Sequence, residues 1–136
     1  MKVVLDSNVW LSGIFWKGEA YNLINRLSKL NIKIMISKDI LLEINEVLNR
    51  EAKFQRFLVE RNIKIKNLME TILKFTVLVV PKEKFSIIKE DPKDNKFLEL
   101  AYRNADYIIT YDKHLLKLKR FNGIKIVKPK DFLGLM

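Results

Sequence analysis

Apolar residues along the chain gather in short β-rich runs that are separated by longer segments of helical periodicity. The β-rich runs are continuous, as in strands that are covered on both faces of a parallel sheet. They occupy Val3–Leu5, Lys33–Ile36, Val77–Val80, Tyr107–Thr110 and Ile124–Val127. A chain in which such strands alternate with helices favours a three-layer α/β/α fold with a mainly parallel sheet. At 136 residues, the chain is expected to form one domain over residues 1–136.

Cap residues and apolar spacing predict the helices between these strands. Ser37 is a good N-cap, and Asp91-Pro92 offers a cap followed by proline at the first helical position. The predicted helices occupy Asn8–Leu30 (one or two helices, broken around Gly13–Gly18), Ser37 to about Arg50, Phe54–Thr76 (two helices, broken near Asn62), Asp91 to about Asn104, Asp112 to about Phe121, and a short segment after Pro129.

The charge balance indicates a polyanionic partner. Lys and Arg outnumber Asp and Glu by 26 to 16, which gives a net charge of +10. This balance favours a nucleic acid over an anionic membrane surface. The chain has no cysteine and only one histidine, His114, so thiolate sites and two-histidine metal sites are excluded within one chain. No signal peptide or membrane span is apparent, and we expect a cytoplasmic protein.

Two aspartates stand at the ends of predicted strands. Asp6 follows the first strand and Asp112 follows the fourth. The carboxyl ends of parallel strands share one edge of a sheet, so both side chains are expected in a crevice there. Each has an alternative role as a helix N-cap. Asp106 precedes the fourth strand and is expected at the opposite edge, away from the crevice.

Two further carboxylates are predicted to point toward the same edge from helices. Glu43 lies roughly 40° outside the apolar stripe of its helix, at the boundary of the buried face, although an ordinary surface position is the alternative. Asp94 falls in the middle of an apolar arc that includes Phe97 and Leu98. A carboxylate on a buried face must be paired, protonated or bound to a metal. Asp91 is expected to cap this helix, and neither Asp91 nor Glu46 is expected to reach the centre of the crevice.

Four carboxylates at one edge require a cation. They would repel one another and raise one another's pKa values unless a cation neutralised them. Donor sets made only of oxygen favour Mg²⁺ or Mn²⁺. With a basic chain around such a site, the expected chemistry is attack of water on the phosphorus of a nucleic acid, with the metal stabilising the leaving oxygen.

Four segments together resemble the PIN-domain family. They are V-L-D-S-N-V (4–9), S-K-D-I-L-L-E-I-N-E-V-L (37–48), D-P-K-D-N-K-F-L-E-L-A (91–101) and A-D-Y-I-I-T-Y-D-K-H-L-L (105–116). The resemblance is strongest to small prokaryotic PIN toxins. It implies a three-layer fold with a five-stranded parallel sheet and an endoribonuclease that cleaves single-stranded RNA with Mg²⁺ or Mn²⁺. It also implies an antitoxin protein partner and is compatible with a homodimer.

The resemblance also assigns site residues. The catalytic and metal-binding acids correspond to Asp6, Glu43, Asp94 and Asp112, and the supporting polar residues correspond to Ser7, Asn8, Asn95 and Thr110. The chain departs from the family pattern at His114, where many relatives carry an acid; this histidine either contacts phosphate or is a partly exposed helix residue.

The basic residues that follow Asp112 are expected to flank the crevice and to bind nucleic acid through phosphate contacts. They are Lys113, His114, Lys117, Lys119 and Arg120. A solvated surface is the alternative for these charges. The departure at His114 also leaves open an alternative function, a catalytically idle nucleic-acid-binding or regulatory module. Such a module should bind no divalent metal in the crevice.

Overall fold

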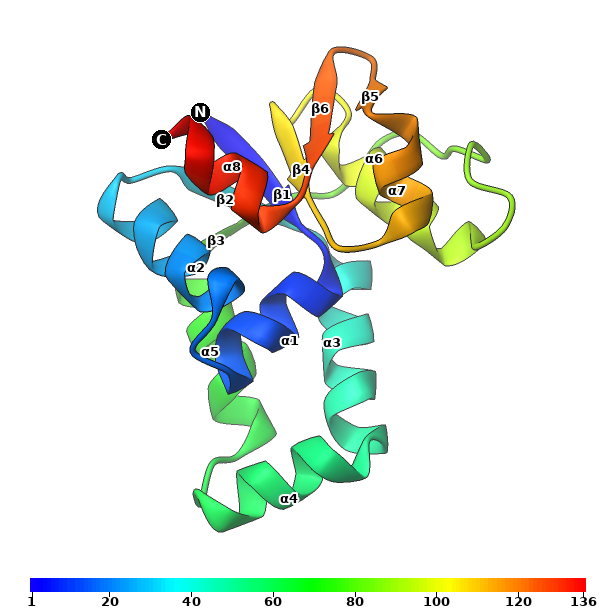
Figure 1. The fold of residues 1–136 in the computed structure, drawn as a ribbon. Coiled ribbons are helices and arrows are strands. Elements are labelled where there is room, and N and C mark those ends of the chain that lie inside the picture. The colour runs from blue at the N-terminus through cyan, green and yellow to red at the C-terminus, as the bar shows by residue number, and fades with distance from the viewer.

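The computed structural model describes residues 1–136 and shows eight α-helices around a central sheet (Figure 1). The strands are β1 (Lys2–Leu5), β2 (Lys33–Ile36), β3 (Thr76–Leu78), β4 (Tyr107–Ile109), β5 (Arg120–Phe121) and β6 (Ile124–Val127). The helices are α1 (Ser7–Phe15), α2 (Glu19–Lys29), α3 (Lys38–Arg50), α4 (Ala52–Glu60), α5 (Ile65–Lys74), α6 (Asn95–Ala101), α7 (Lys113–Leu118) and α8 (Pro129–Leu135), and a 3₁₀ turn covers Pro92–Asp94.

The sheet is parallel except at one edge. Its strand order is β3-β2-β1-β4-β6-β5, and only β5 is antiparallel to its neighbour. In the register, Val3 of β1 lies between Ile34 of β2 and Tyr107 of β4. The predicted mainly parallel sheet is therefore confirmed. The carboxyl ends of β1, β2 and β4 meet at one edge, where the site residues that follow them converge.

The prediction of five strands was wrong, because a short hairpin adds a sixth. Arg120 and Phe121 pair with Lys125 and Ile124 across an Asn122-Gly123 turn. Both turn residues have positive φ, 49° and 82°, as the favoured two-residue hairpin turn requires. The helix that follows Asp112 consequently ends at Leu118, earlier than predicted. The Asn-Gly pair was the sequence signal for this hairpin.

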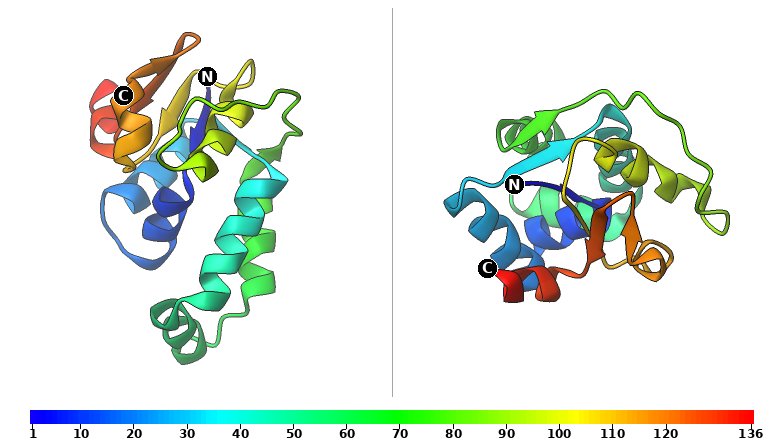
Figure 2. Two further views of the ribbon diagram at one scale, coloured as in Figure 1. Left: turned by 90° about the vertical axis from the view of Figure 1, so that its right-hand side faces the viewer. Right: turned by 90° about the horizontal axis from the view of Figure 1, so that it is seen from above.

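Helices cover both faces of the sheet (Figure 2). On one face α6 contacts β1, β2 and β4, and α3 and α5 lie on the same side. On the other face α2 packs against α1, α8 and β2. The three-layer architecture is thus confirmed. In Figure 1, α3 and α5 extend beyond the carboxyl edge of the sheet to α4, at the end of the molecule opposite the two termini.

The core forms around the three central strands. The last three residues of β1 and of β2 are buried, and Ile108 and Ile109 of β4 are fully buried. Fully burying a side chain of this size stabilises the fold by about 1.5–3 kcal/mol. The strands are covered on both faces, which explains their continuous apolar runs. None of the helices has the length and the apolar character that a membrane span requires.

The predicted helix breaks are confirmed, and one predicted helix changes form. The chain breaks between α1 and α2 and again between α4 and α5, where Asn62 has a φ of 53°. The helix expected from Asp91 to Asn104 starts instead with the 3₁₀ turn and ends at Ala101. It stops there because Tyr102 leaves helical geometry and Arg103 has a φ of 62°.

Two glycines provide a matched test of the packing between α1 and α2. A Cβ on Gly13 would clash with Ile24 Cδ1 and would lie 3.2 Å from the Ala20 carbonyl oxygen, whereas a Cβ on Gly134 in α8 would meet nothing within 4 Å. We expect Gly13→Ala to lower the free energy of unfolding by about 1–2 kcal/mol because of overpacking. The control Gly134→Ala should raise it by up to about 1 kcal/mol through helix propensity. Denaturant titrations measure both, and equal effects would contradict close packing of α1 on α2.

Candidate metal centre

A polar crevice lies at the carboxyl edge of the sheet, between α1, α3 and the loops that precede α6 and α7. Its volume is about 360 Å³. The charged residues that line it are Asp39, Glu43, Glu46, Arg50, Asp91, Lys93, Asp94, Lys96 and Asp112, and its other lining residues are Ser7, Asn8, Leu42 and Val47. Six carboxylates face three cations there, so the lining is acidic although the whole protein carries +10. We call this space the acidic crevice.

Asp6 lies behind the acidic crevice and is only 2% exposed. Its Oδ1 accepts a hydrogen bond from the Val9 N–H at 2.9 Å, which caps α1. Its Oδ2 accepts one from the Thr110 hydroxyl. The same hydroxyl oxygen accepts the Asp112 N–H at 2.8 Å. Thr110 thereby joins the ends of β1 and β4 and fixes the backbone of Asp112.

Glu43 projects from α3 into the acidic crevice and is held by two side chains. The Ser7 hydroxyl donates to Oε1, and the Lys96 Nζ lies 2.5 Å from Oε2. Lys96 and Glu43 are both mostly buried. Both carboxylate oxygens therefore already have a donor from the chain itself. The sequence offered no signal for the role of Lys96, since 53 residues separate it from Glu43.

Four side chains converge in another part of the acidic crevice. Asp91, Asp94, Asp112 and His114 each place one ligand atom within 4.8 Å of the others. The prediction that Asp91 would not reach the centre of the crevice was wrong, because its carboxylate lies beside those of Asp94 and Asp112. The α-helix begins three residues later than expected, so the Asp91 side chain makes no capping bond and faces the crevice. Glu46 lines the outer wall and pairs with Arg50 at 2.8 Å.

The structure places the remaining predicted residues as follows. Asp106 accepts a hydrogen bond from the Lys2 N–H at the opposite edge, as predicted. Asn8 lines the acidic crevice. Asn95 is buried and bonds the backbone of Ile87, Ile88 and Pro92, so it holds the loop that carries Asp91. His114 is half-buried. The other basic residues that follow Asp112 are exposed, and they are Lys113, Lys117, Lys119 and Arg120.

Burial and mutual repulsion change the acidity of two carboxyl groups. Burial raises the pKa of Asp6 above its ordinary value, although the Thr110 hydroxyl and the Val9 N–H oppose this change. Burial, with the neighbouring charges of Asp112 and Asp91, raises the pKa of Asp94 to about 7. Shifts of this kind are concentrated at functional sites, because structures made only for stability avoid unpaired buried carboxylates.

The donor set fits a divalent cation. Asp94 is 9% exposed, and its Oδ2 is buried without any hydrogen-bond partner. An orphaned buried carboxylate oxygen costs free energy that a metal ion would recover. Both hydrogen bonds to the Asp112 carboxylate end on Oδ1, which leaves Oδ2 for a cation. Asp94 and Asp112 are therefore suited to hold the ion that the crevice requires.

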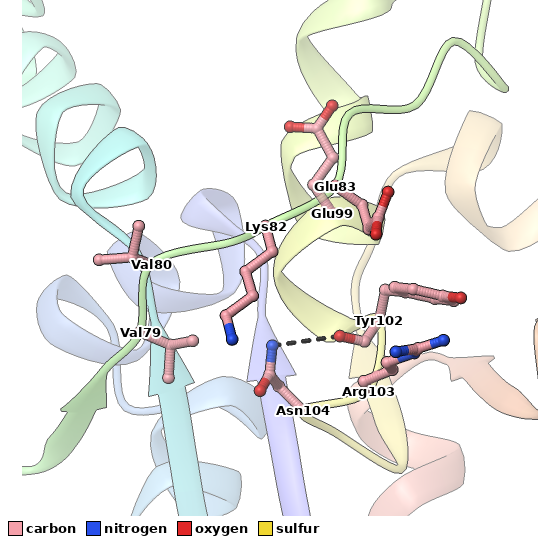
Figure 3. A pocket seen from close by; sticks show the side chains of 8 residues that line it. All are labelled: Val79, Val80, Lys82, Glu83, Glu99, Tyr102, Arg103 and Asn104. Carbon is pink, nitrogen blue, oxygen red and sulfur yellow. Dashed lines mark hydrogen bonds between the residues drawn. The ribbon is translucent and has the colours of Figure 1, made fainter.

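A second hollow lies under the segment that follows β3 and has a different character (Figure 3). It measures about 230 Å³, and Figure 3 shows the Lys82 side chain extending across it. Its buried acid, Glu99, accepts the Phe85 N–H at 2.9 Å and lies 3.9 Å from Lys84 Nζ. The Glu99 carboxylate is thus bonded to the loop, and Glu83 is the one other acid in the lining. This hollow therefore lacks a metal-binding cluster.

The raised pKa of Asp94 predicts how metal-free stability depends on pH. The unfolded carboxyl titrates near 3.9, and the folded one near 7, so the folded protein holds the proton more tightly. The stabilisation from this group is complete below about pH 4 and is lost as the pH rises through about 7. In EDTA, we expect Asp94→Asn to lose less stability than wild type between about pH 5 and pH 8. Denaturant titrations at both pH values, with Asp106→Asn as control, measure this. Identical pH dependence in wild type and Asp94→Asn would contradict it.

Comparisons with known proteins agree with the fold. A model of the PIN domain matches residues 2–114. The chain is 29% identical over 143 residues to Uncharacterized protein MJ1680 of Methanocaldococcus jannaschii, covering 98% of this chain and 90% of that relative. Its fold is similar to a chain of VapBC2 from Rickettsia felis, in the crystal structure of VapBC2 bound to a DNA fragment from their promoter. That match has a TM-score of 0.61 and 16% identity and covers 93% and 97% of the two chains. The domain match includes Asp6, Glu43, Asp94 and Asp112, and the chain belongs to the PIN-domain family.

Proposed function

We propose that this chain is a divalent-metal-dependent endoribonuclease that cleaves single-stranded RNA. The observation that carries the proposal is the orphaned, buried Asp94 carboxylate beside Asp112 in an acidic crevice of a basic protein. A buried carboxylate with no donor is stabilised by a proton or by a cation. A cation among carboxylates attracts phosphate. Membership of the PIN-domain family supports a nuclease.

The side chains divide the work of such a reaction. Asp94 and Asp112 would hold Mg²⁺ or Mn²⁺, with Asp6 and Glu43 as the other catalytic acids around the crevice. A bound divalent cation supplies Lewis-acid assistance at phosphorus and at the leaving oxygen. Ser7 and Lys96 orient Glu43, and Thr110 orients both Asp6 and Asp112. In the net reaction, water adds to phosphorus, one P–O ester bond breaks, and the leaving oxygen takes up a proton.

The RNA backbone would be bound by cations on two sides of the acidic crevice. Lys93 and Lys96 line it, and the exposed residues of α7 and β5 lie beyond Asp112. Asp112 caps α7 and lines the crevice, so this helix begins at the crevice. Phosphate contacts of this type provide affinity and position without base recognition. Trp16 and Tyr111 are exposed at 52% and 41% and are available for stacking on unpaired bases.

We further propose that the chain is the toxin of a toxin–antitoxin pair. The fold is similar to a chain of VapBC2 from Rickettsia felis, which was crystallised bound to a DNA fragment from their promoter, and this similarity supports a protein partner. The sequence resemblance to small prokaryotic PIN toxins points in the same direction. An antitoxin that covers the acidic crevice would keep the nuclease inactive, and a homodimer is compatible with this arrangement.

RNA cleavage tests the nuclease directly. Wild type should cleave labelled single-stranded RNA with Mg²⁺ or Mn²⁺ and not in EDTA. Asp112→Asn should lower the rate constant at saturating RNA by about 10²-fold or more while RNA binding is retained, because the lost charge acts on the chemical step. Asp106→Asn, at the opposite edge of the sheet, should cleave like wild type. Undiminished cleavage by Asp112→Asn would exclude this mechanism.

The same assay has an arm that separates binding from chemistry. Lys117→Ala combined with Lys119→Ala should weaken RNA binding and reduce the slope of log K against log salt by about 1–2, because two phosphate contacts are lost. The rate at saturating RNA should change little. If wild type cleaves no RNA and binds no divalent metal, the catalytically idle module becomes the better description.

Growth of a bacterial host tests the toxin. Induced expression of wild type should arrest growth, because uncontrolled cleavage stops translation, while Asp112→Asn expressed to the same level should not. Viable counts after induction, with immunoblots to match expression, measure the effect. Normal growth with active wild-type nuclease in the cells would refute the toxin role and leave the nuclease intact.

A further inference from the structure

We propose that Asp91, Asp94, Asp112 and His114 together form a site for one divalent metal ion. This site prefers a transition-metal ion to Mg²⁺. The inference deepens the proposed function, on which it rests for its catalytic consequence. Metal binding is measured in the absence of RNA, so the metal site and the nuclease activity can be refuted separately.

The geometry of the four side chains supports a shared ion. Their ligand atoms lie within 4.8 Å of one another. Around an ion with bonds of about 2.0–2.2 Å, two donors on opposite sides lie about 4.0–4.4 Å apart, and adjacent donors lie about 3.0–3.5 Å apart. The most distant ligand atoms therefore have to approach one another by up to roughly 1–2 Å, which is within the reach of side-chain rotations. Two of them come from the loop before α6 and two from the start of α7, so these two segments bring all four ligands to one point.

Two buried donor atoms in this group have no partner. Asp94 is 9% exposed and its Oδ2 makes no hydrogen bond. His114 Nδ1 is buried and also unpartnered, and its distance of 3.8 Å from Asp112 Oδ1 is too long for a hydrogen bond. Buried polar atoms are normally satisfied. One cation between them would satisfy both at once.

Glu43 and Asp6, the other two acids of the site, already accept hydrogen bonds from the chain itself. Glu43 is bonded to Ser7 and Lys96, and Asp6 is bonded to Val9 and Thr110. Lys96 thus supplies a positive charge on the Glu43 side of the acidic crevice. The uncompensated negative charge lies on the opposite side, at Asp91, Asp94 and Asp112. A resident metal is consequently needed there first.

The imidazole determines which ion is preferred. Mg²⁺ is a hard ion that takes oxygen ligands and keeps its waters. Imidazole is a good ligand for Co²⁺, Ni²⁺ and Zn²⁺, whose affinities for such sites exceed that of Mn²⁺. Three carboxylates with one imidazole thus favour a transition metal. An aspartate in place of His114 would restore the all-oxygen site that suits Mg²⁺.

The single histidine makes a spectroscopic test unambiguous. Untagged wild type is loaded with Mn²⁺ and examined by pulsed electron paramagnetic resonance. We expect hyperfine coupling to one ¹⁴N nucleus of an imidazole, which can come only from His114, the one histidine of the chain. No variant is needed, so folding is not in question. An Mn²⁺ complex without imidazole ¹⁴N coupling would overturn the inference.

Calorimetric titrations with Co²⁺ and Mg²⁺ test selectivity. His114→Asn should bind Co²⁺ at least about tenfold more weakly than wild type, because the loss of a metal ligand lowers metal affinity at least as much as the loss of a supporting residue. The Mg²⁺ affinity of this variant should stay close to that of wild type. Asp91→Asn should weaken both ions. Glu46→Gln, in the same crevice but paired with Arg50, should weaken neither.

The outcomes separate the two proposals. Unchanged Co²⁺ affinity in folded His114→Asn would overturn the inference while RNA cleavage by wild type could still hold. Wild type that shows ¹⁴N coupling and selects Co²⁺ but cleaves no RNA would retain the metal site and overturn the nuclease. Thermal melts of each variant in EDTA establish that it is folded.

Discussion

The hydrogen bond from the Thr110 hydroxyl to the buried Asp6 carboxylate is the contact on which the geometry of the acidic crevice depends. It joins the ends of β1 and β4, two adjacent parallel strands, at the edge where the reactive side chains gather. The same hydroxyl oxygen receives the Asp112 N–H. Asp112 in turn caps α7 through the N–H groups of His114 and Leu115. One buried side chain thereby fixes three neighbouring elements relative to one another.

The acidic crevice has the opposite charge to the protein as a whole. Lysines and arginines dominate the chain, yet six carboxylates line one crevice. These carboxylates repel one another, and the chain itself offsets part of the repulsion. Lys96 pairs with Glu43, and the amino ends of α1, α3 and α7 provide helix dipoles that favour negative charge. The remainder is visible in the raised pKa of Asp94. A site of this kind is less stable without a cation than with one, which links metal binding to stability.

The cap roles of Asp6 and Asp112 show that a structural and a chemical role can coexist. Each aspartate caps a helix with one carboxylate oxygen, as the sequence allowed. A carboxylate has two oxygens, so the cap does not exhaust the group. For Asp6 the second oxygen binds Thr110, and for Asp112 it is left for a cation. Asp91 shows the converse, since its expected cap never forms and its side chain stays available.

The sequence by itself determined the parallel sheet, most helix boundaries and the family, because continuous apolar runs, cap residues and motif spacing are local properties. It also predicted the inward direction of Asp94, since helical periodicity places that residue among buried neighbours. Only the tertiary structure decided the pairing of Lys96 with Glu43, the entry of Asp91 into the crevice and the approach of His114 to Asp94. These depend on contacts between segments far apart in the chain and on a 3₁₀ turn that replaces the first α-helical turn after Asp91. Such contacts follow from how the layers pack, which no local pattern encodes.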